Sequence, residues 1–196
     1  MVGYRLKIPK ETLDKHRNVY LTADIFFVNK ITFFLSCSRK INYTGVENLN
    51  NRKSQTIFEA FVAIYKVYRR RNFIITTTSV DDKFATLKER IEAMPGGPRV
   101  NLAAAKEHVP EIERRIRVVK EQVQAIRHSM PFKRIPKPLL AHTVTGAVRM
   151  LNFFPTKGGI SETLSPKATF DGEHLNMKNH LCSPDTRSIP ATTGYP

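Results

Sequence analysis

The sequence predicts an α/β fold, a mixed five-stranded sheet flanked by helices. Three observations support this prediction. Short segments with strand periodicity come first, segments with helical periodicity then alternate with strands, and no apolar segment is long enough to span a bilayer. The chain has 196 residues, of which 41% are hydrophobic, which is enough for one substantial core.

Residues 20–28 predict the central strand of this sheet, because they are apolar and rich in β-branched and aromatic residues. Alternate side chains point to opposite faces, and both faces are largely apolar, as in a strand that is covered on both sides. One face holds Leu21, Ala23, Ile25 and Phe27, and the other holds Thr22, Asp24, Phe26 and Val28. A carboxylate in such a strand must be paired, hydrogen-bonded, protonated or bound to a metal. Asp24 is therefore either a functional residue or a carboxylate held by a neighbouring Lys or Arg.

Two further strands are expected beside the central one. Asn29 and Lys30 favour a tight turn into a strand at residues 31–36. Residues 41–46 predict a weaker third strand, in which Gly45 can mark a bulge. These three strands would form a meander.

Helical periodicity begins after the meander. Thr56 and Glu59 have the spacing of a capping box, and the helix that they would start runs to about Arg71. Asn72 can end this helix in a left-handed conformation. Residues 73–80 then predict another strand, which ends directly on two aspartates.

The second half of the chain alternates in the same way. A helical stripe over residues 84–94 is followed by a short strand at residues 99–104. The strongest periodicity in the chain predicts a helix from Pro110 to Met130, with proline as a favourable first residue. A further helix is expected at residues 137–154.

Composition divides the chain into four parts. We expect a loose lead-in at residues 1–18, the folded core at residues 19–155 and an irregular extension at residues 156–182. Residues 183–196 contain three prolines and almost no large apolar side chain, so they predict a disordered tail.

The formal net charge of +15 indicates a polyanionic partner. Nucleic acid is the leading candidate and an anionic membrane surface the second, while a basic protein-interaction domain is a third interpretation. Basic side chains that contact phosphates set the affinity and its salt dependence rather than the sequence preference. The candidate phosphate contacts are Arg114, Arg115, Arg117, Lys120, Lys133 and Arg134.

The chain has only two cysteines, Cys37 and Cys182, which are too few for a disulfide framework. The six His and two Cys also lack the spacing of a zinc site. We therefore expect an intracellular protein, and a nuclear one if its partner is DNA.

Three carboxylates form a candidate metal site. Asp24 lies in the central strand, Asp81 follows the strand at residues 73–80, and Glu113 lies early in the long helix, with Glu111 and Glu107 as alternatives for the third position. Carboxylates that converge repel one another unless cations neutralise them, and oxygen ligands suit Mg²⁺ or Mn²⁺. Glu113 and Glu111 would alternatively only favour the positive end of the helix dipole.

Three motifs resemble the integrase catalytic core of copia-type LTR retrotransposons, which has a ribonuclease-H-like fold. Residues 22–29 look like its first-strand motif, residues 80–84 like its Asp-Gly-Glu-Phe element, and residues 108–115 like its Glu-Arg segment. The resemblance implies that Asp24, Asp81 and Glu113 hold two divalent cations and are the catalytic residues. It implies DNA integration by phosphoryl transfer, with DNA as partner and a homo-oligomer as one possible assembly.

The chain departs from this pattern beside the second aspartate. Asp82 replaces a glycine and Lys83 a glutamate, and the Lys83 ammonium can act as a built-in cation that pairs with Asp81 or Asp82. The residues before Asp24 are too few for a zinc-binding module, so we expect a stand-alone and possibly decayed core. The alternative is a catalytically inactive nucleic-acid-binding remnant of a retroelement.

Overall fold

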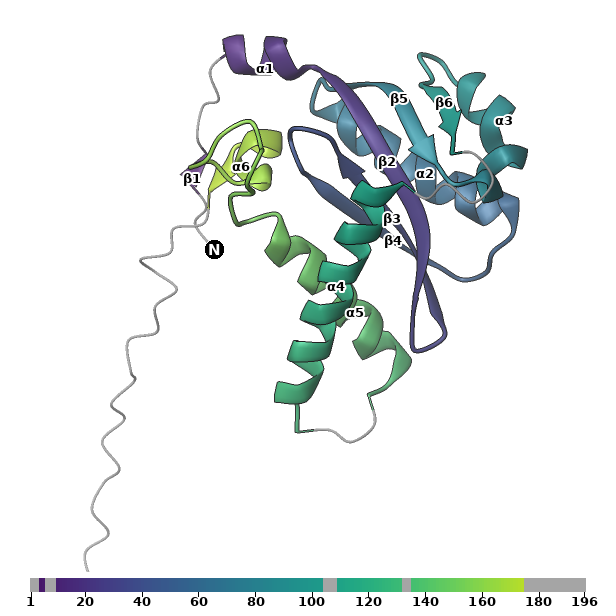
Figure 1. Ribbon diagram of the computed structural model, residues 1–196, viewed down its shortest axis with the longest axis vertical. Coiled ribbons are helices and arrows are strands. Elements are labelled where there is room, and N and C mark those ends of the chain that lie inside the picture. The colour runs from purple at the N-terminus through teal and green to yellow at the C-terminus, as the bar shows by residue number, and fades with distance from the viewer. Residues whose placement is uncertain (1–3, 6–9, 104–108, 132–134, 175–196) are drawn as a thin grey trace, which may run out of the picture.

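The computed structural model describes residues 4–5, 10–103, 109–131 and 135–174 (Figure 1). A five-stranded sheet with the order β4-β3-β2-β5-β6 forms its centre. The β2, β3 and β4 strands form an antiparallel meander, while β2, β5 and β6 run parallel to one another. The strands are β2 (Asn18–Val28), β3 (Ile31–Ser38), β4 (Thr44–Leu49), β5 (Ile74–Val80) and β6 (Arg99–Leu102). This arrangement confirms the predicted fold class.

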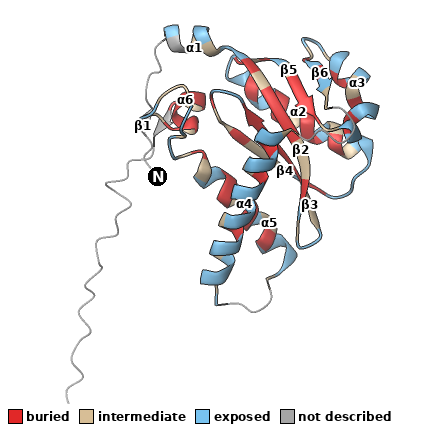
Figure 2. Ribbon diagram, in the orientation of Figure 1, coloured by how far each residue is buried: buried red, intermediate tan, exposed pale blue. Residues whose placement is uncertain are grey.

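Helices cover both faces of the sheet (Figures 1 and 2). One hydrophobic cluster joins the sheet to α2, η1 and α3, and a second joins it to α4 and α5. The central strand contributes to both, since Leu21 and Ala23 lie in the first cluster and Phe26 lies in the second. The helices are α2 (Ser54–Arg70), the 3₁₀-helix η1 (Asp82–Leu87), α3 (Lys88–Glu92), α4 (Pro110–Ser129) and α5 (Lys137–Leu151).

Two of the predicted turns have the expected backbone conformation. Asn29 and Lys30 have φ values of 46° and 66°, which is the conformation of a two-residue hairpin turn. Asn72 has a φ of 63° directly after the end of α2. Both predictions are therefore confirmed.

The predicted capping box of α2 is wrong. The helix begins at Ser54, and its N-cap residue Lys53 makes no side-chain cap. The Thr56 hydroxyl donates instead to Oδ1 of Asn51 at 2.8 Å, because that side chain lies just before the helix. Glu59 accepts a bond from Gln55, one turn earlier.

The third strand begins later than predicted. Residues after Ser38 turn tightly, with φ values of 66° at Lys40 and 58° at Asn42, so pairing with β3 starts only at Thr44. The predicted bulge at Gly45 is absent, since the β3–β4 register is continuous there. The irregularity lies between β2 and β5, where the register shifts after Val19.

The two ends of the described chain contain more structure than expected. The α1 helix (Lys10–His16) occupies part of the expected loose lead-in, and its Leu13 packs against the first cluster. The α6 helix (Pro166–Asp171) lies in the expected irregular extension, and β1 (Tyr4–Arg5) pairs with β7 (Glu173–His174). Leu13 of α1 and Phe170 of α6 both pack with the first cluster, which accounts for the two helices. Residues 183–196, the predicted tail, lie outside the described residues.

Candidate active site

Asp24 and Asp81 lie side by side, level with the carboxyl end of β5. The β2 and β5 strands are parallel, and Ala23 pairs with Val80 in their register. The next residue of each chain segment is an aspartate, Asp24 within β2 and Asp81 directly after β5. The carboxyl ends of parallel strands form the edge at which sites of open α/β sheets commonly lie.

The Asp24 carboxylate lies in an environment that disfavours its charge. Burial raises the pKa of Asp24, and the charges of Asp81 and Glu113 raise it further. The backbone N–H of Ile25, 2.6 Å from Oδ1 of Asp24, and the ammonium of Lys83 oppose this shift of the pKa. Asp24 is thus a carboxylate whose charged form would gain from a nearby cation.

The Asp81 carboxylate is held by the backbone of the next residue and by a lysine. It accepts a bond from the N–H of Asp82 at 2.9 Å and so caps the N-terminus of η1. Nζ of Lys83 lies 2.9 Å from Oδ2 of Asp81, as expected for a built-in cation. The pair lies at the rim of the site, since the Lys83 side chain is 71% exposed and that of Asp81 only 17%.

The third carboxylate is on α4. Glu113 lies in the first turn of this helix and is near enough to raise the pKa of Asp24. The alternative Glu111 accepts both contacts of Nε of Arg39 at 2.9 Å, on another side of the helix. The other alternative, Glu107, lies outside the described residues.

The donor set can be compared with what a divalent cation requires. In the described part of the chain, no group of three or more His, Cys, Asp or Glu side chains is placed so that it could hold a metal ion. Asp24 and Asp81 nevertheless supply only oxygen donors, and their mutual repulsion is of the kind that Mg²⁺ or Mn²⁺ relieves. The type of donor therefore suits such an ion, but the described side chains do not form a site for one, and Lys83 already binds Asp81.

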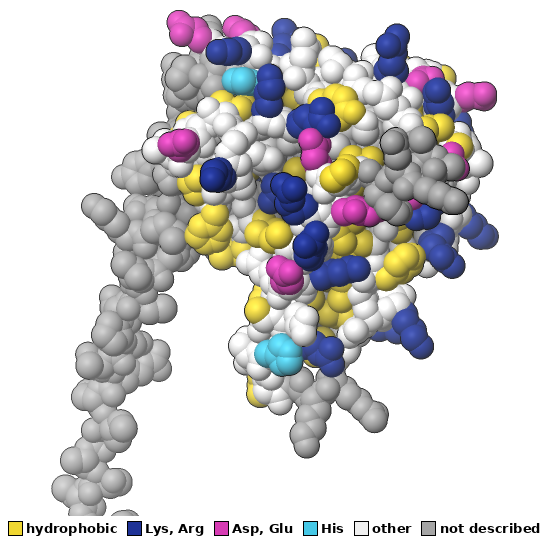
Figure 3. All heavy atoms as spheres, in the orientation of Figure 1, with side chains coloured by type: hydrophobic (Ala, Val, Ile, Leu, Met, Phe, Trp, Pro, Cys, Tyr) yellow, Lys and Arg dark blue, Asp and Glu magenta, His cyan; other side chains and the backbone are white. Residues whose placement is uncertain are grey.

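The candidate phosphate contacts of α4 fall on two sides of the helix. Successive helical residues are about 100° apart, so Arg117 and Lys120 lie on the side of Glu113, whereas Arg115 lies on the opposite side with Glu111. Figure 3 shows Lys and Arg side chains among carboxylates on the face that carries α4. Lys133 and Arg134 lie outside the described residues.

Sequence reasoning named Glu111 and Arg115 but missed Arg39 and Tyr20, which lie with them at the second side of α4. Arg39 stacks on the ring of Tyr20, with 4.1 Å between the guanidinium carbon and the ring centroid, and binds Glu111 from the helix. Arg115 lies beside the buried thiol of Cys37 and opposes the increase of its pKa by burial. No sequence signal connects Arg39 with Glu111, because 72 positions separate them.

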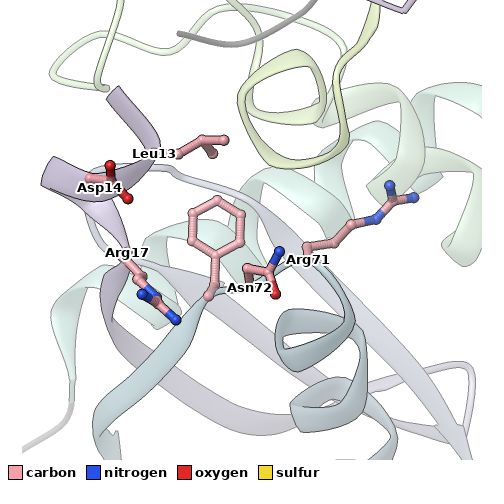
Figure 4. A pocket seen from close by; sticks show the side chains of 6 residues that line it. Leu13, Asp14, Arg17, Arg71 and Asn72 are labelled. Carbon is pink, nitrogen blue, oxygen red and sulfur yellow. The ribbon is translucent and has the colours of Figure 1, made fainter. Parts of the chain in front are cut away.

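A further pocket, of about 420 Å³, lies at the other end of the sheet (Figure 4). Asn72 and Phe73 line it, and they precede β5, whereas Asp81 follows the same strand. At about 3.3 Å per strand residue, β5 places the two locations some 20 Å apart. This pocket is therefore separate from the carboxylates.

Within the described ranges, none of the helices is both long and apolar enough to cross a membrane. No family model matches the chain, and no curated protein matches it. Among solved structures, the chain is similar to the catalytic core domain of BIV integrase, with 12% identity and a TM-score of 0.55. The alignment covers 77% of this chain and 92% of that chain. The protein thus has the ribonuclease-H-like fold of integrase catalytic cores.

Proposed function

We propose that the protein is a metal-dependent polynucleotidyl transferase of the integrase type, similar to the cores of copia-type retrotransposons. The observation that carries this proposal is the adjacency of Asp24 and Asp81 on parallel strands, with Glu113 near enough to act on the pKa of Asp24. The similarity of the fold to an integrase core supports the same reading.

In this proposal Asp24, Asp81 and Glu113 would hold the two divalent cations. The charge of Asp24 is disfavoured by burial and by its two acidic neighbours, so a bound cation gains the interaction that the folded chain alone lacks. When bound, Mg²⁺ or Mn²⁺ would supply an activated hydroxyl and stabilise the leaving oxygen of phosphoryl transfer. Arg117 and Lys120 continue the side of α4 that carries Glu113 and would hold the DNA backbone there.

Lys83 supports a second candidate function. Its ammonium already binds Asp81, which weakens the need for a metal ion at that carboxylate. A protein in which this pair replaces the metal would be an inactive nucleic-acid-binding remnant of a retroelement. Both candidates have DNA as partner, so both imply a nuclear location and leave assembly as a homo-oligomer open to measurement.

A metal titration discriminates between the two candidates. Mn²⁺ binding, measured by electron paramagnetic resonance, should saturate in the wild-type protein and be weakened at least tenfold in Asp24→Asn. Asp14→Asn makes the same chemical change at an exposed position of α1 and serves as the control. Equal binding by the wild type and Asp24→Asn would contradict a metal site at Asp24, and would favour the remnant.

A further inference from the structure

The side of α4 that faces away from Glu113 lines a pocket of about 430 Å³, which we call the Arg39 pocket. It lies between α4, the turn after β3 and residues 156–158. Among the described residues, five cationic side chains and a single carboxylate line it: Arg39, Lys40, Arg114, Arg115, Lys157 and Glu111.

Contacts within the fold hold the pocket in shape. The ring of Tyr20 and the carboxylate of Glu111 hold Arg39 in place. Of the five N–H groups of its guanidinium, these contacts use only the one at Nε. The turn and the loop that form the other wall are joined by a backbone bond from the N–H of Ile160 to the carbonyl of Lys40, 3.1 Å long. The fold therefore holds the Arg39 guanidinium and the backbone of the turn, and the other cations of the pocket lie around them.

Like charges that the fold brings together repel one another, and one carboxylate does not balance five cations. A bound anion would remove this repulsion. Arginine favours the phosphate group in particular, because its planar N–H groups bind two oxygens at once. The volume is within the range of pockets that take small ligands or one segment of a chain.

We propose that the Arg39 pocket binds a backbone phosphate of nucleic acid, on the side of α4 opposite the carboxylates. This proposal takes one element from the proposed function, namely that the polyanionic partner is a nucleic acid. It implies two separate nucleic-acid contacts on one helix, because Lys120 lines a different hollow, which it shares with Arg127 and with Phe27 of the β2–β3 hairpin. The net charge of +15 favours a nucleic acid strand over a free phosphate compound.

Binding of a labelled DNA duplex to the full chain, followed by fluorescence anisotropy over a series of salt concentrations, tests this proposal. The pocket variant is Arg114→Gln with Lys157→Gln, two exposed positions of the lining. The control variant is Lys66→Gln with Arg99→Gln, which removes the same charge from two exposed positions elsewhere. Circular dichroism shows whether each variant keeps the fold.

Each lost phosphate contact lowers the slope of log affinity against log salt by about 0.9, so the pocket variant should lose up to about two units of slope. The control should keep the wild-type slope. Equal losses in the pocket variant and the control would overturn the proposal, because total charge alone would then explain binding. Unchanged DNA binding in the pocket variant, with loss of thermal stabilisation by inorganic pyrophosphate, would also overturn it and identify a free phosphate compound as ligand.

These readouts involve no catalysis. If the slopes are as expected but metal-dependent activity is absent, the phosphate pocket is supported and only the proposed enzyme function is contradicted. If activity depends on Asp24 but the pocket variant binds DNA normally, only the proposal for the pocket is contradicted. The two proposals therefore fail independently.

Discussion

The ammonium nitrogen of Lys83 lies 2.9 Å from Oδ2 of Asp81, at the rim of the candidate active site. The bond to Asp81 raises the pKa of Lys83, and the ammonium also lowers the pKa of Asp24. The lysine therefore performs part of the charge compensation that a divalent cation would provide. It links the chemistry of the site to the stability of the chain without metal.

Removal of this ammonium should strengthen metal binding. An ion pair at the rim contributes about 0.2–1 kcal/mol, so Lys83→Gln should increase the affinity for Mn²⁺ by up to about fivefold. Electron paramagnetic resonance of free Mn²⁺ measures this change, with Lys66→Gln as the control for total charge. Weaker Mn²⁺ binding in Lys83→Gln than in the wild type would show that the lysine does not compete for the site.

The charge of Asp24 should destabilise the protein in the absence of metal. Because burial and its acidic neighbours raise the pKa of Asp24 above 3.8, the folded state holds this proton more tightly than the unfolded chain does. Stability is therefore lost as the pH rises from about 3.8 through the raised pKa, and the loss is complete above it. Asp24→Asn does not titrate and escapes this loss.

Urea unfolding with a chelator, from pH 3 to pH 7, measures the difference between the wild type and Asp24→Asn. The variant should be the more stable of the two at pH 7, and its advantage should shrink toward pH 3. Asparagine keeps the acceptor for the N–H of Ile25, so this bond survives the substitution. An advantage that does not change with pH would argue against the charge as its cause.

Asn152 should anchor the end of α5 to the edge of the sheet. Its buried side chain accepts a bond from the N–H of Thr44 and donates one to the carbonyl of the same residue, both 2.8 Å long. Asn152→Ala leaves these two buried backbone groups without that partner, which should lower the free energy of unfolding by about 2–4 kcal/mol. Urea unfolding measures the change. A loss below about 0.5 kcal/mol, the level of an ordinary surface substitution, would be inconsistent with an anchoring role.

Phe170 should anchor α6 to the hydrophobic core and so contribute to the stability of the fold. Its ring stacks on Tyr43 with centroids 4.0 Å apart and on Phe73 with centroids 5.2 Å apart, and it is buried. Phe170→Ala should therefore lower the free energy of unfolding by about 3–5 kcal/mol. Phe154→Ala, at an exposed position, is the control and should have little effect. Similar losses for the two variants would speak against this packing.

The sequence was sufficient for the fold because its periodicity is local. Both faces of residues 20–28 are apolar, and this pattern alone places the strand between two layers of helices. The capping box at Thr56 was a local pattern too, but Asn51 lies within reach of the hydroxyl and competes for it. A short motif thus fails where a nearby side chain offers an alternative bond.

The candidate site could be predicted only in part, because sequence patterns are local and the site depends on contacts between distant residues. Strand register brings Asp24 and Asp81 together, since each follows one residue of the pair Ala23–Val80 on the parallel strands β2 and β5. The partner of Glu111 was not predictable, because Arg39 lies far away in the sequence and meets Glu111 only in the fold. Helical periodicity separates Arg115 from Lys120, but the neighbours of each side chain depend on how α4 lies on the sheet. Tertiary contacts of this kind leave no periodic signal.

Cleavage of an end-labelled DNA duplex in the presence of Mn²⁺ is the most direct test of the central claim, that Asp24 and its neighbours are a centre for phosphoryl transfer. The variants are Asp24→Asn, the control Asp14→Asn and the double change Asp82→Gly with Lys83→Glu, each checked for its fold by circular dichroism. We predict cleavage by the wild type and by Asp14→Asn, greater cleavage by the double variant, and none above background by Asp24→Asn. Equal cleavage by the wild type and Asp24→Asn, or no cleavage by any folded variant, would contradict the account.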